Sequence, residues 1–140
     1  MWDPIAPALA RRPAEAAELV CLAISDGDLE AALAQYENGA VPRPLATSAD
    51  GLEESAADDV AGELTALMDF RLPLALHVRA VVPGNGVALV LAERHMRGTG
   101  SDGQTVRLSG SGATLVRRGP DGTWRIAADA WGLIGEAEPA

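Results

Sequence analysis

The sequence predicts an α+β fold in which helices come first and an antiparallel sheet follows. Helical periodicity fills the first half of the 140-residue chain, and long runs of alternating residues fill the second half. Two turn signals divide the last part of the chain, at 98–103 (GTGSDG) and at 119–122 (GPDG). Because helices and strands occupy separate parts of the sequence, the pattern favours α+β over an alternating α/β architecture.

Three helices are expected, at 13–25, 29–36 and 52–69. The first begins with a proline, which suits the first turn of a helix, and is apolar on most sides from residue 19 to residue 24. An aspartate caps the second, and the third has apolar residues at every fourth position. An irregular leader at 1–12 precedes them, and a short edge strand at 40–41 is expected between the second and third helices.

The sheet is expected to contain one strand at 72–82 and a meander of three more strands within 86–132. Side chains alternate along the first of these runs. The runs are close to ten residues or longer, so the sheet has a substantial face to bury. A chain of 140 residues suits one core, and we expect a single domain over 1–140.

Composition excludes several classes of function. The net charge of −9 argues against nucleic acid or an anionic membrane as a partner. No apolar run approaches the roughly 20 residues that span a bilayer, and the first residues lack the charge order of a signal peptide. All eleven basic residues are arginine, which excludes a lysine Schiff base and a phosphate-loop lysine.

Cysteine and histidine point to neither a disulfide nor a metal site. Cys21 is the single cysteine, and its apolar helical surroundings favour a small buried side chain over a nucleophile. His77 and His95 fall on different expected strands and outside metal-binding motifs, so surface or interface positions are expected for both. We therefore expect no metal, no cofactor and a cytoplasmic location.

Three segments carry a resemblance to a known superfamily. They are 24–41 (ISDGDLEAALAQYENGAV), 70–82 (FRLPLALHVRAVV) and 112–132 (GATLVRRGPDGTWRIAADAWG). Together they resemble the ketosteroid isomerase-like proteins of the nuclear transport factor 2-like superfamily, in particular its SnoaL-like bacterial branch. The resemblance implies a cone-shaped barrel, in which three N-terminal helices pack in a strongly curved antiparallel sheet with an apolar cavity at the open end.

The same resemblance assigns a cavity face to each strand. Asp129 and Arg94 become the candidate catalytic residues, because they are charged and fall on this face. The ligand-binding candidates are Tyr36, Val90, Ala92, Met96, Thr114, Val116, Ala127 and Trp131. Alternation along the strands is compatible with this assignment but does not choose the face.

Steroid isomerisation is not expected. That chemistry needs a carboxylate base, a tyrosine and a protonated aspartic acid. The corresponding positions fall at 43–44, at Val20 and near 113–114, and all three groups are lost. Polyketide cyclases of the branch rely on a cavity carboxylate, for which Asp129 is the candidate.

Two classes of function remain open. In the first, the protein is a cyclase-, isomerase- or hydratase-like enzyme that transfers a proton on a small apolar substrate, with Asp129 as acid or base and Arg94 orienting it or binding an oxyanion. In the second, it is a non-catalytic ligand-binding module or a dimeric scaffold. An ion pair of Asp129 with Arg94 or Arg125 would be a purely structural role for these charges.

A homodimer is also expected, through the convex face of the sheet. The sheet is covered by helices on one side only, and apolar residues are expected on its other side. The residues assigned to this outer face are Leu89, Leu91, Glu93, His95, Leu115, Arg117, Trp124 and Ile126.

Overall fold

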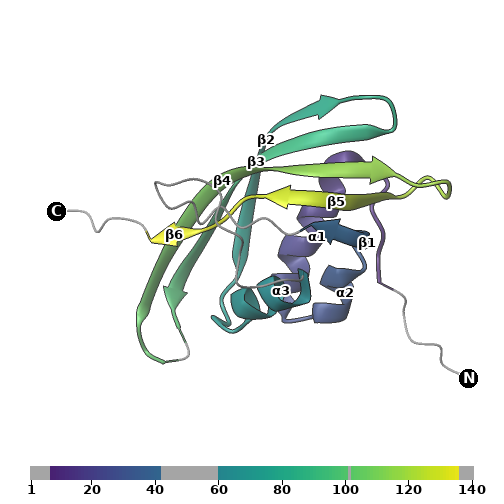
Figure 1. Cartoon of the computed structure of the whole chain (residues 1–140). Coiled ribbons are helices and arrows are strands. Elements are labelled where there is room, and N and C mark those ends of the chain that lie inside the picture. Colours follow the sequence, from purple (N-terminus) through teal and green to yellow (C-terminus); the bar gives the residue numbers. More distant parts are fainter. Residues whose placement is uncertain (1–6, 42–59, 101, 136–140) are drawn as a thin grey trace, which may run out of the picture.

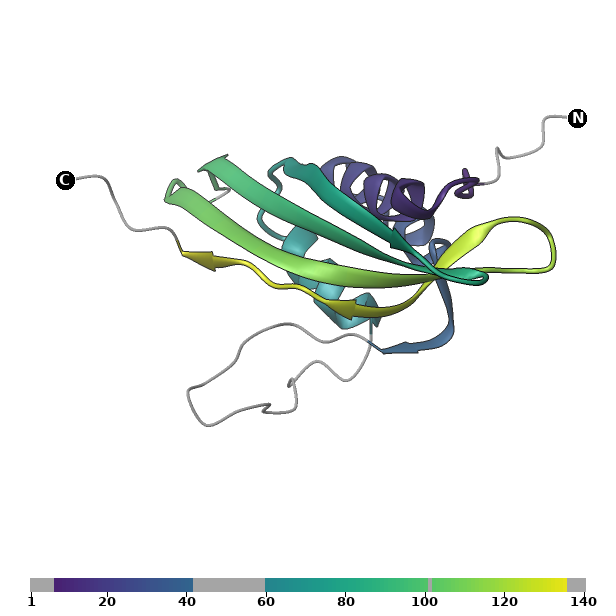
Figure 2. The ribbon, with the colours of Figure 1, turned by 90° about the horizontal axis from the view of Figure 1, so that it is seen from above.

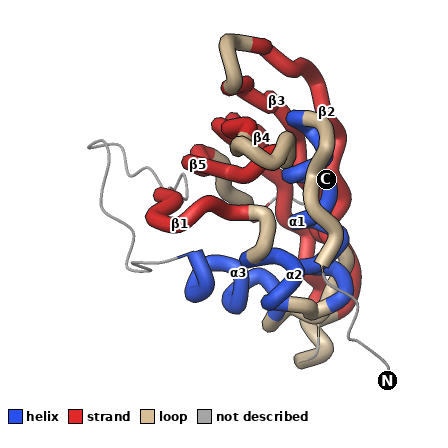
Figure 3. The backbone as a smooth tube through the Cα atoms, turned by 90° about the vertical axis from the view of Figure 1, so that its right-hand side faces the viewer, coloured by secondary structure: helices blue, strands red, loops and turns tan. Residues whose placement is uncertain are grey.

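The computed structural model of the chain describes residues 7–41, 60–100 and 102–135 (Figure 1). The elements follow in the order α1 (Pro13–Asp26), α2 (Leu29–Leu33), β1 (Tyr36–Val41), α3 (Val60–Met68), β2 (Leu74–Pro83), β3 (Val87–Thr99), β4 (Thr105–Arg118), β5 (Trp124–Ala130) and β6 (Ile134–Gly135). The helices precede the long strands and lie on one side of the sheet (Figure 3), so the predicted α+β class is confirmed.

The sheet has the strand order β1-β5-β4-β3-β2, and β6 pairs with β4 beside this path. Neighbouring long strands are antiparallel, as the meander predicts, whereas β1 is parallel to β5 and makes the sheet mixed. The strands bend strongly around the helices, and β6 continues in the line of β5 (Figures 1 and 2). No pairing joins β1 to β2 among the described residues, so the curved sheet is not closed.

The chain leaves α2 earlier than the sequence predicts. The helix expected at 29–36 ends at Leu33, and β1, expected at 40–41, begins at Tyr36. The backbone oxygen of Gln35 accepts a hydrogen bond of 2.7 Å from the backbone N–H of Ile126. Pairing with β5 therefore replaces the last helical turn, and it places Tyr36 on a strand beside β5.

Other element bounds also differ from the expectations. The first half of the helix expected at 52–69 lies outside the described residues, and α3 is described over Val60–Met68. The strand expected at 72–82 is Leu74–Pro83. The last strand ends at Ala130, and the short strand β6 that follows was not predicted.

Helix α1 forms the centre of the core. Its buried residues are Ala16, Ala17, Val20, Cys21, Ala23 and Ile24. They belong to one buried cluster with Ala88, Val90, Met96 and Val116 from the concave face of the sheet. Cover from the sheet thus explains most of the apolar run in this helix, whereas Leu22 within the run is exposed.

A β-bulge in β5 reverses the predicted direction of two side chains. Leu115 pairs with Ala128 and Val116 pairs with Ile126, so Ala127 is an extra residue in β5. Ile126 is 1% exposed, and Trp124 packs against the core cluster. Their assignment to the outer face is wrong, because the bulge shifts the alternation by one residue on its N-terminal side.

Two glycines in β4 allow the chain after β5 to pass very close to the sheet. A Cβ on Gly112 would collide with the backbone of Ala130 and with Trp131, and a Cβ on Gly110 would collide with the carbonyl of Gly132. Both glycines lie between the part of β4 that pairs with β5 and the part that pairs with β6. The absence of side chains at these two positions allows the backbone around Trp131 to pass this close to β4.

Candidate functional site

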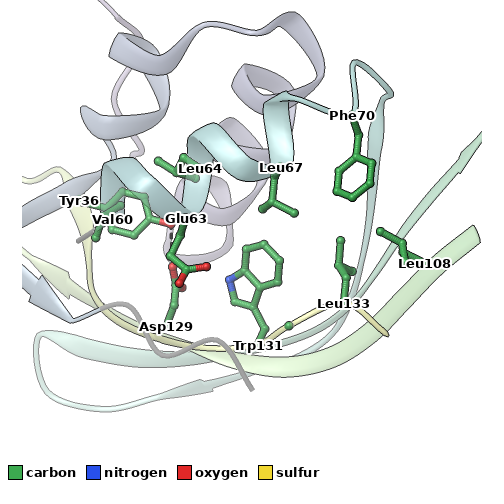
Figure 4. A pocket seen from close by; sticks show the side chains of 11 residues that line it. Tyr36, Val60, Glu63, Leu64, Leu67, Phe70, Leu108, Asp129, Trp131 and Leu133 are labelled. Carbon is green, nitrogen blue, oxygen red and sulfur yellow. Dashed lines mark hydrogen bonds between the residues drawn. The ribbon is translucent and has the colours of Figure 1, made fainter. Parts of the chain in front are cut away.

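A cavity of about 310 Å³ lies between α3 and the C-terminal part of the sheet (Figure 4). Its lining is mainly apolar, with a few polar groups among aliphatic and aromatic side chains. The lining residues are Tyr36, Val60, Glu63, Leu64, Leu67, Phe70, Leu108, Asp129, Trp131, Gly132 and Leu133. An apolar cavity with few convergent polar groups is typical of a small-molecule site.

Asp129 on β5 is an acidic residue of the cavity wall, and two of its hydrogen-bond partners lie on β1 and β4. It is 8% exposed, and both of its carboxylate oxygens accept hydrogen bonds. The Tyr36 hydroxyl on β1 donates to Oδ2 at 2.6 Å, and the Thr114 hydroxyl on β4 donates to Oδ1 at 3.0 Å. Thr114 is the cross-strand partner of Asp129, so the sheet register itself creates the second contact.

Burial and hydrogen bonding act on the pKa of Asp129 in opposite directions. Burial raises the pKa, while the hydrogen bonds from Tyr36 and Thr114 and the charge of Arg94 lower it. Burial dominates, so the pKa lies above its ordinary value of 3.8. Burial, and then the charge of Asp129, also raise the pKa of Tyr36 well above 10.0, which keeps the phenol protonated as a donor.

Arg94 lies behind this group and is almost fully buried. Its Nη2 donates to the Thr114 hydroxyl at 3.4 Å, and its Cζ lies 4.1 Å from the centre of the Trp131 ring. Within the described part of the chain, its Nε and Nη1 have no hydrogen-bond partner. The thiol of Cys21 is close enough to interact with Arg94, but burial raises the pKa of this thiol to about 11 and leaves it neutral.

Neither ion pair considered from the sequence is formed among the described residues. The Thr114 hydroxyl stands between Arg94 and Asp129, and it accepts from the first while donating to the second. Arg125 instead lies 3.6 Å from the Asp121 carboxylate in the adjacent turn. Arg94 and Asp129 therefore interact electrostatically without a direct hydrogen bond.

The candidates named from the sequence fall into three groups. Tyr36, Asp129 and Trp131 line the cavity. Arg94 and Thr114 form the hydrogen-bonded layer behind it. The remaining ones are buried and do not line it, namely Val90, Ala92, Met96, Val116 and Ala127.

Sequence reasoning missed the wall that α3 contributes. Leu64 was part of the predicted stripe of this helix, and its neighbours on the stripe could have been assigned to the cavity from the same periodicity. Glu63 gave no such signal, because an acidic residue on a helix is usually solvated. Figure 4 shows Glu63 and Leu67 pointing from α3 toward Asp129 and Trp131.

The described residues contain neither a cluster of possible metal ligands nor a helix that could span a membrane. Over these residues, no group of three or more His, Cys, Asp or Glu side chains is placed to hold a metal ion. Within the same residues, no helix is both long and apolar enough to cross a bilayer.

The sequence matches no protein-family model and no curated protein. Solved structures nevertheless share the fold. A ketosteroid isomerase-like protein from Erwinia carotovora atroseptica superposes with a TM-score of 0.65 at 19% identity, over 89% of this chain and 95% of that one. A nuclear transport factor 2-like superfamily protein from Salmonella enterica serovar Typhimurium gives 0.59 at 17% identity, over 90% and 89%.

A third structure, a nuclear transport factor 2-like protein of unknown function from Shewanella oneidensis, has a TM-score of 0.61 at 16% identity and covers 84% of this chain and 93% of that one. The chain therefore has the ketosteroid isomerase-like, nuclear transport factor 2-like fold. The fold that the sequence resemblance implies is confirmed. At these identities the similarity concerns the fold, and function has to be argued from the site.

Proposed function

We propose that the protein binds a small, mainly apolar molecule in this cavity and that Asp129 transfers a proton on it. The observation that carries the proposal is a buried carboxylate with a raised pKa in the wall of an apolar cavity. A general base or acid works best when its pKa is near the working pH, and burial moves Asp129 in that direction.

The surroundings of Asp129 support a defined division of roles. The ionised carboxylate removes a proton from a carbon next to a substrate carbonyl, and the electron pair moves onto the carbonyl oxygen. In an isomerisation, the electron pair returns to re-form the carbonyl, and the protonated Asp129 gives its proton to another carbon of the substrate. In a dehydration, the returning electrons break the C–O bond at the neighbouring carbon, and the hydroxyl takes the proton from Asp129 and leaves as water. Tyr36 and Thr114 hold the carboxylate in place, and Arg94, which donates to the Thr114 hydroxyl, orients this group from behind and favours its ionised form.

Asp129→Asn tests the proposal, because it keeps the shape of the side chain and removes its titration. Incubating the protein in D₂O with a panel of small apolar ketones and enones would reveal proton transfer as deuterium uptake at carbon, measured by NMR. We expect the variant to lose turnover by a factor of about 100 or more. The matched control is Asp26→Asn, an exposed residue at the end of α1, which should leave turnover unchanged. Full activity in Asp129→Asn would refute the catalytic role.

A non-catalytic binding module is the second candidate. It is favoured by the fact that both oxygens of Asp129 already accept hydrogen bonds from the protein. In that case the carboxylate is part of a structural network, and the cavity serves only to hold a ligand. Ligand binding without deuterium uptake for any compound of the panel would support this alternative.

We further propose that the protein acts as a homodimer in the cytoplasm. The single cysteine favours the cytoplasmic location. The dimer contact would use the convex face, where Val82, Leu89 and Leu91 are exposed on adjoining strands. A two-fold contact between identical faces would cover these side chains.

A further inference from the structure

We propose that the molecule bound in the cavity is a small apolar carboxylic acid, whose carboxylate binds the guanidinium of Arg94 in place of the Trp131 ring. The inference rests on the proposed function only for the choice of cavity. It holds equally for an enzyme and for a binding protein.

The first step is the incomplete bonding of Arg94. The residue is 2% exposed, and its Nε and Nη1 have no hydrogen-bond partner in the described part of the chain. These two atoms carry three N–H groups. Buried polar groups are almost always paired, and an unpaired charged donor is especially costly. The contacts that Arg94 does make are one long hydrogen bond to Thr114, an interaction with the neutral thiol of Cys21, and the face of Trp131.

The second step is that the groups around Arg94 do not complete its bonding. Asp129 directs its oxygens to Tyr36 and Thr114 rather than to Arg94. Cys21 is a neutral thiol and only a weak acceptor. The missing partner is therefore an acceptor with a negative charge, and a carboxylate provides both properties.

The third step is access from the cavity. The Trp131 ring lies against the guanidinium and also lines the cavity, whereas Arg94 itself does not line it. The indole thus separates the charge from the cavity. Trp131 follows the end of β5 and precedes Gly132, outside any strand. Binding of the carboxylate would therefore displace the Trp131 ring from the guanidinium and break the side-chain hydrogen bond between Trp131 and Asp129.

The size of the cavity limits the ligand. A volume of about 310 Å³ equals the space of roughly ten water molecules, which corresponds to a molecule of about ten non-hydrogen atoms. The apolar lining from Leu64, Leu67 and Phe70 suits a hydrocarbon or aromatic body. Phenylacetate has this size and one carboxylate, and phenylacetamide is its neutral isostere.

The test is an NMR titration of the ¹⁵N-labelled full chain with three probes: phenylacetate, phenylacetamide and 2-phenylethylamine. We expect phenylacetate to bind roughly tenfold more tightly than phenylacetamide. The resonances of the Arg94 Nε–H and of the Trp131 indole should shift with phenylacetate. Equal affinities for acid and amide would overturn the proposal. So would tighter binding of the amine, which Glu63 and Asp129 in the cavity wall would then explain, or no binding of any probe.

Variants locate the effect. Arg94→Gln should remove the preference for phenylacetate over phenylacetamide, whereas Arg79→Gln, an exposed arginine on the neighbouring strand, should keep it. A preference that survives Arg94→Gln overturns the proposal. If Arg94→Gln does not fold, the acid-to-amide comparison and the Arg94 resonance in the unchanged protein decide the matter.

Asp129→Asn separates this inference from the proposed function. The preference for phenylacetate should persist in that variant, because Arg94 is intact. If Asp129→Asn keeps the preference for phenylacetate and the wild type shows no turnover, the proton-transfer proposal is refuted and the carboxylate-binding proposal is supported. Turnover of neutral ketones without any preference for phenylacetate would support proton transfer and refute the carboxylate site.

Discussion

Asp129 holds its proton more tightly in the folded protein than in the unfolded chain, because burial outweighs its hydrogen bonds. For an acid whose pKa is raised on folding, the stabilising contribution is complete below the unfolded value of 3.8. This contribution is lost as the pH rises through the folded pKa. The stability contributed by a carboxylate in a salt bridge changes with pH in the opposite direction, because its pKa is lowered on folding.

We therefore predict that Asp129→Asn changes how stability depends on pH. The free energy of unfolding of the wild type, minus that of the variant, should fall as the pH rises from about 4 toward neutrality and then become constant. Urea unfolding at several pH values measures this difference. Asp26→Asn is the control and should follow the wild type. A difference that grows with pH would show that the pKa is lowered, as in an ion pair.

Part of the site could be predicted at this scale. Asp129 and Trp131 follow from the resemblance and from alternation along one strand, and the cavity indeed contacts both. The hydrogen bond from Tyr36 could not be predicted, because the sequence pattern places this residue in a helix. The role of Thr114 between Arg94 and Asp129 was also hidden, since opposite charges on one sheet face suggest a direct ion pair.

At the scale of elements, the glycines of β4 set the distance between the sheet and the segment that carries Trp131. Gly112→Ala would force its new methyl group into the backbone of Ala130 and into Trp131. We predict a loss of stability of about 1–3 kcal/mol, which is typical of overpacking. Chemical denaturation monitored by circular dichroism measures the loss.

Gly135→Ala provides the matched control for this change. A Cβ at Gly135 would meet no atom within 4 Å, and the residue lies on the exposed strand β6. Its effect should stay within about 0.5 kcal/mol. Equal stabilities of the two variants would show that the close passage over β4 is not required.

The same strands show where prediction of elements fails. The alternation of β3 was assigned correctly: Leu89 and Leu91 are exposed, and Val90 and Met96 are buried. In β5, Ile126 and Ala127 are both buried because of the bulge, and periodicity in a single strand does not reveal an extra residue. The glycines of the segment SGSG (109–112) were visible in the sequence, but their partner after β5 is distant along the chain.

At the scale of the whole molecule, the fold was predictable because helices and strands are segregated and two turns mark the meander. The parallel strand β1 was not predictable to the same extent. Its pairing with β5 connects residues about 90 positions apart, and few signals in the six residues of β1 specify that contact. This long-range pairing is nevertheless what brings Tyr36 to Asp129.

The outer face of the sheet leads to the prediction for the assembly. Val82 pairs with Leu89, and Leu89 pairs with Leu115, so these apolar side chains form a row across three strands. Leu91, the next outward residue on β3, is 38% exposed. A row of this kind is an unfavourable surface for a monomer in water, and a second copy offers an identical row to cover it.

We predict that the wild type has twice the mass of one 14.4 kDa chain in light scattering at micromolar concentration. Leu91→Arg places a charge in the middle of the row and should yield monomers, with the thermal midpoint measured in parallel to show that the chain still folds. The control is Leu22→Arg on α1, where the leucine is 60% exposed and lies on the helical side of the sheet, so that the dimer should persist. A monomeric wild type would refute the dimer. A dimer that survives Leu91→Arg but not Leu22→Arg would place the contact on the helices instead.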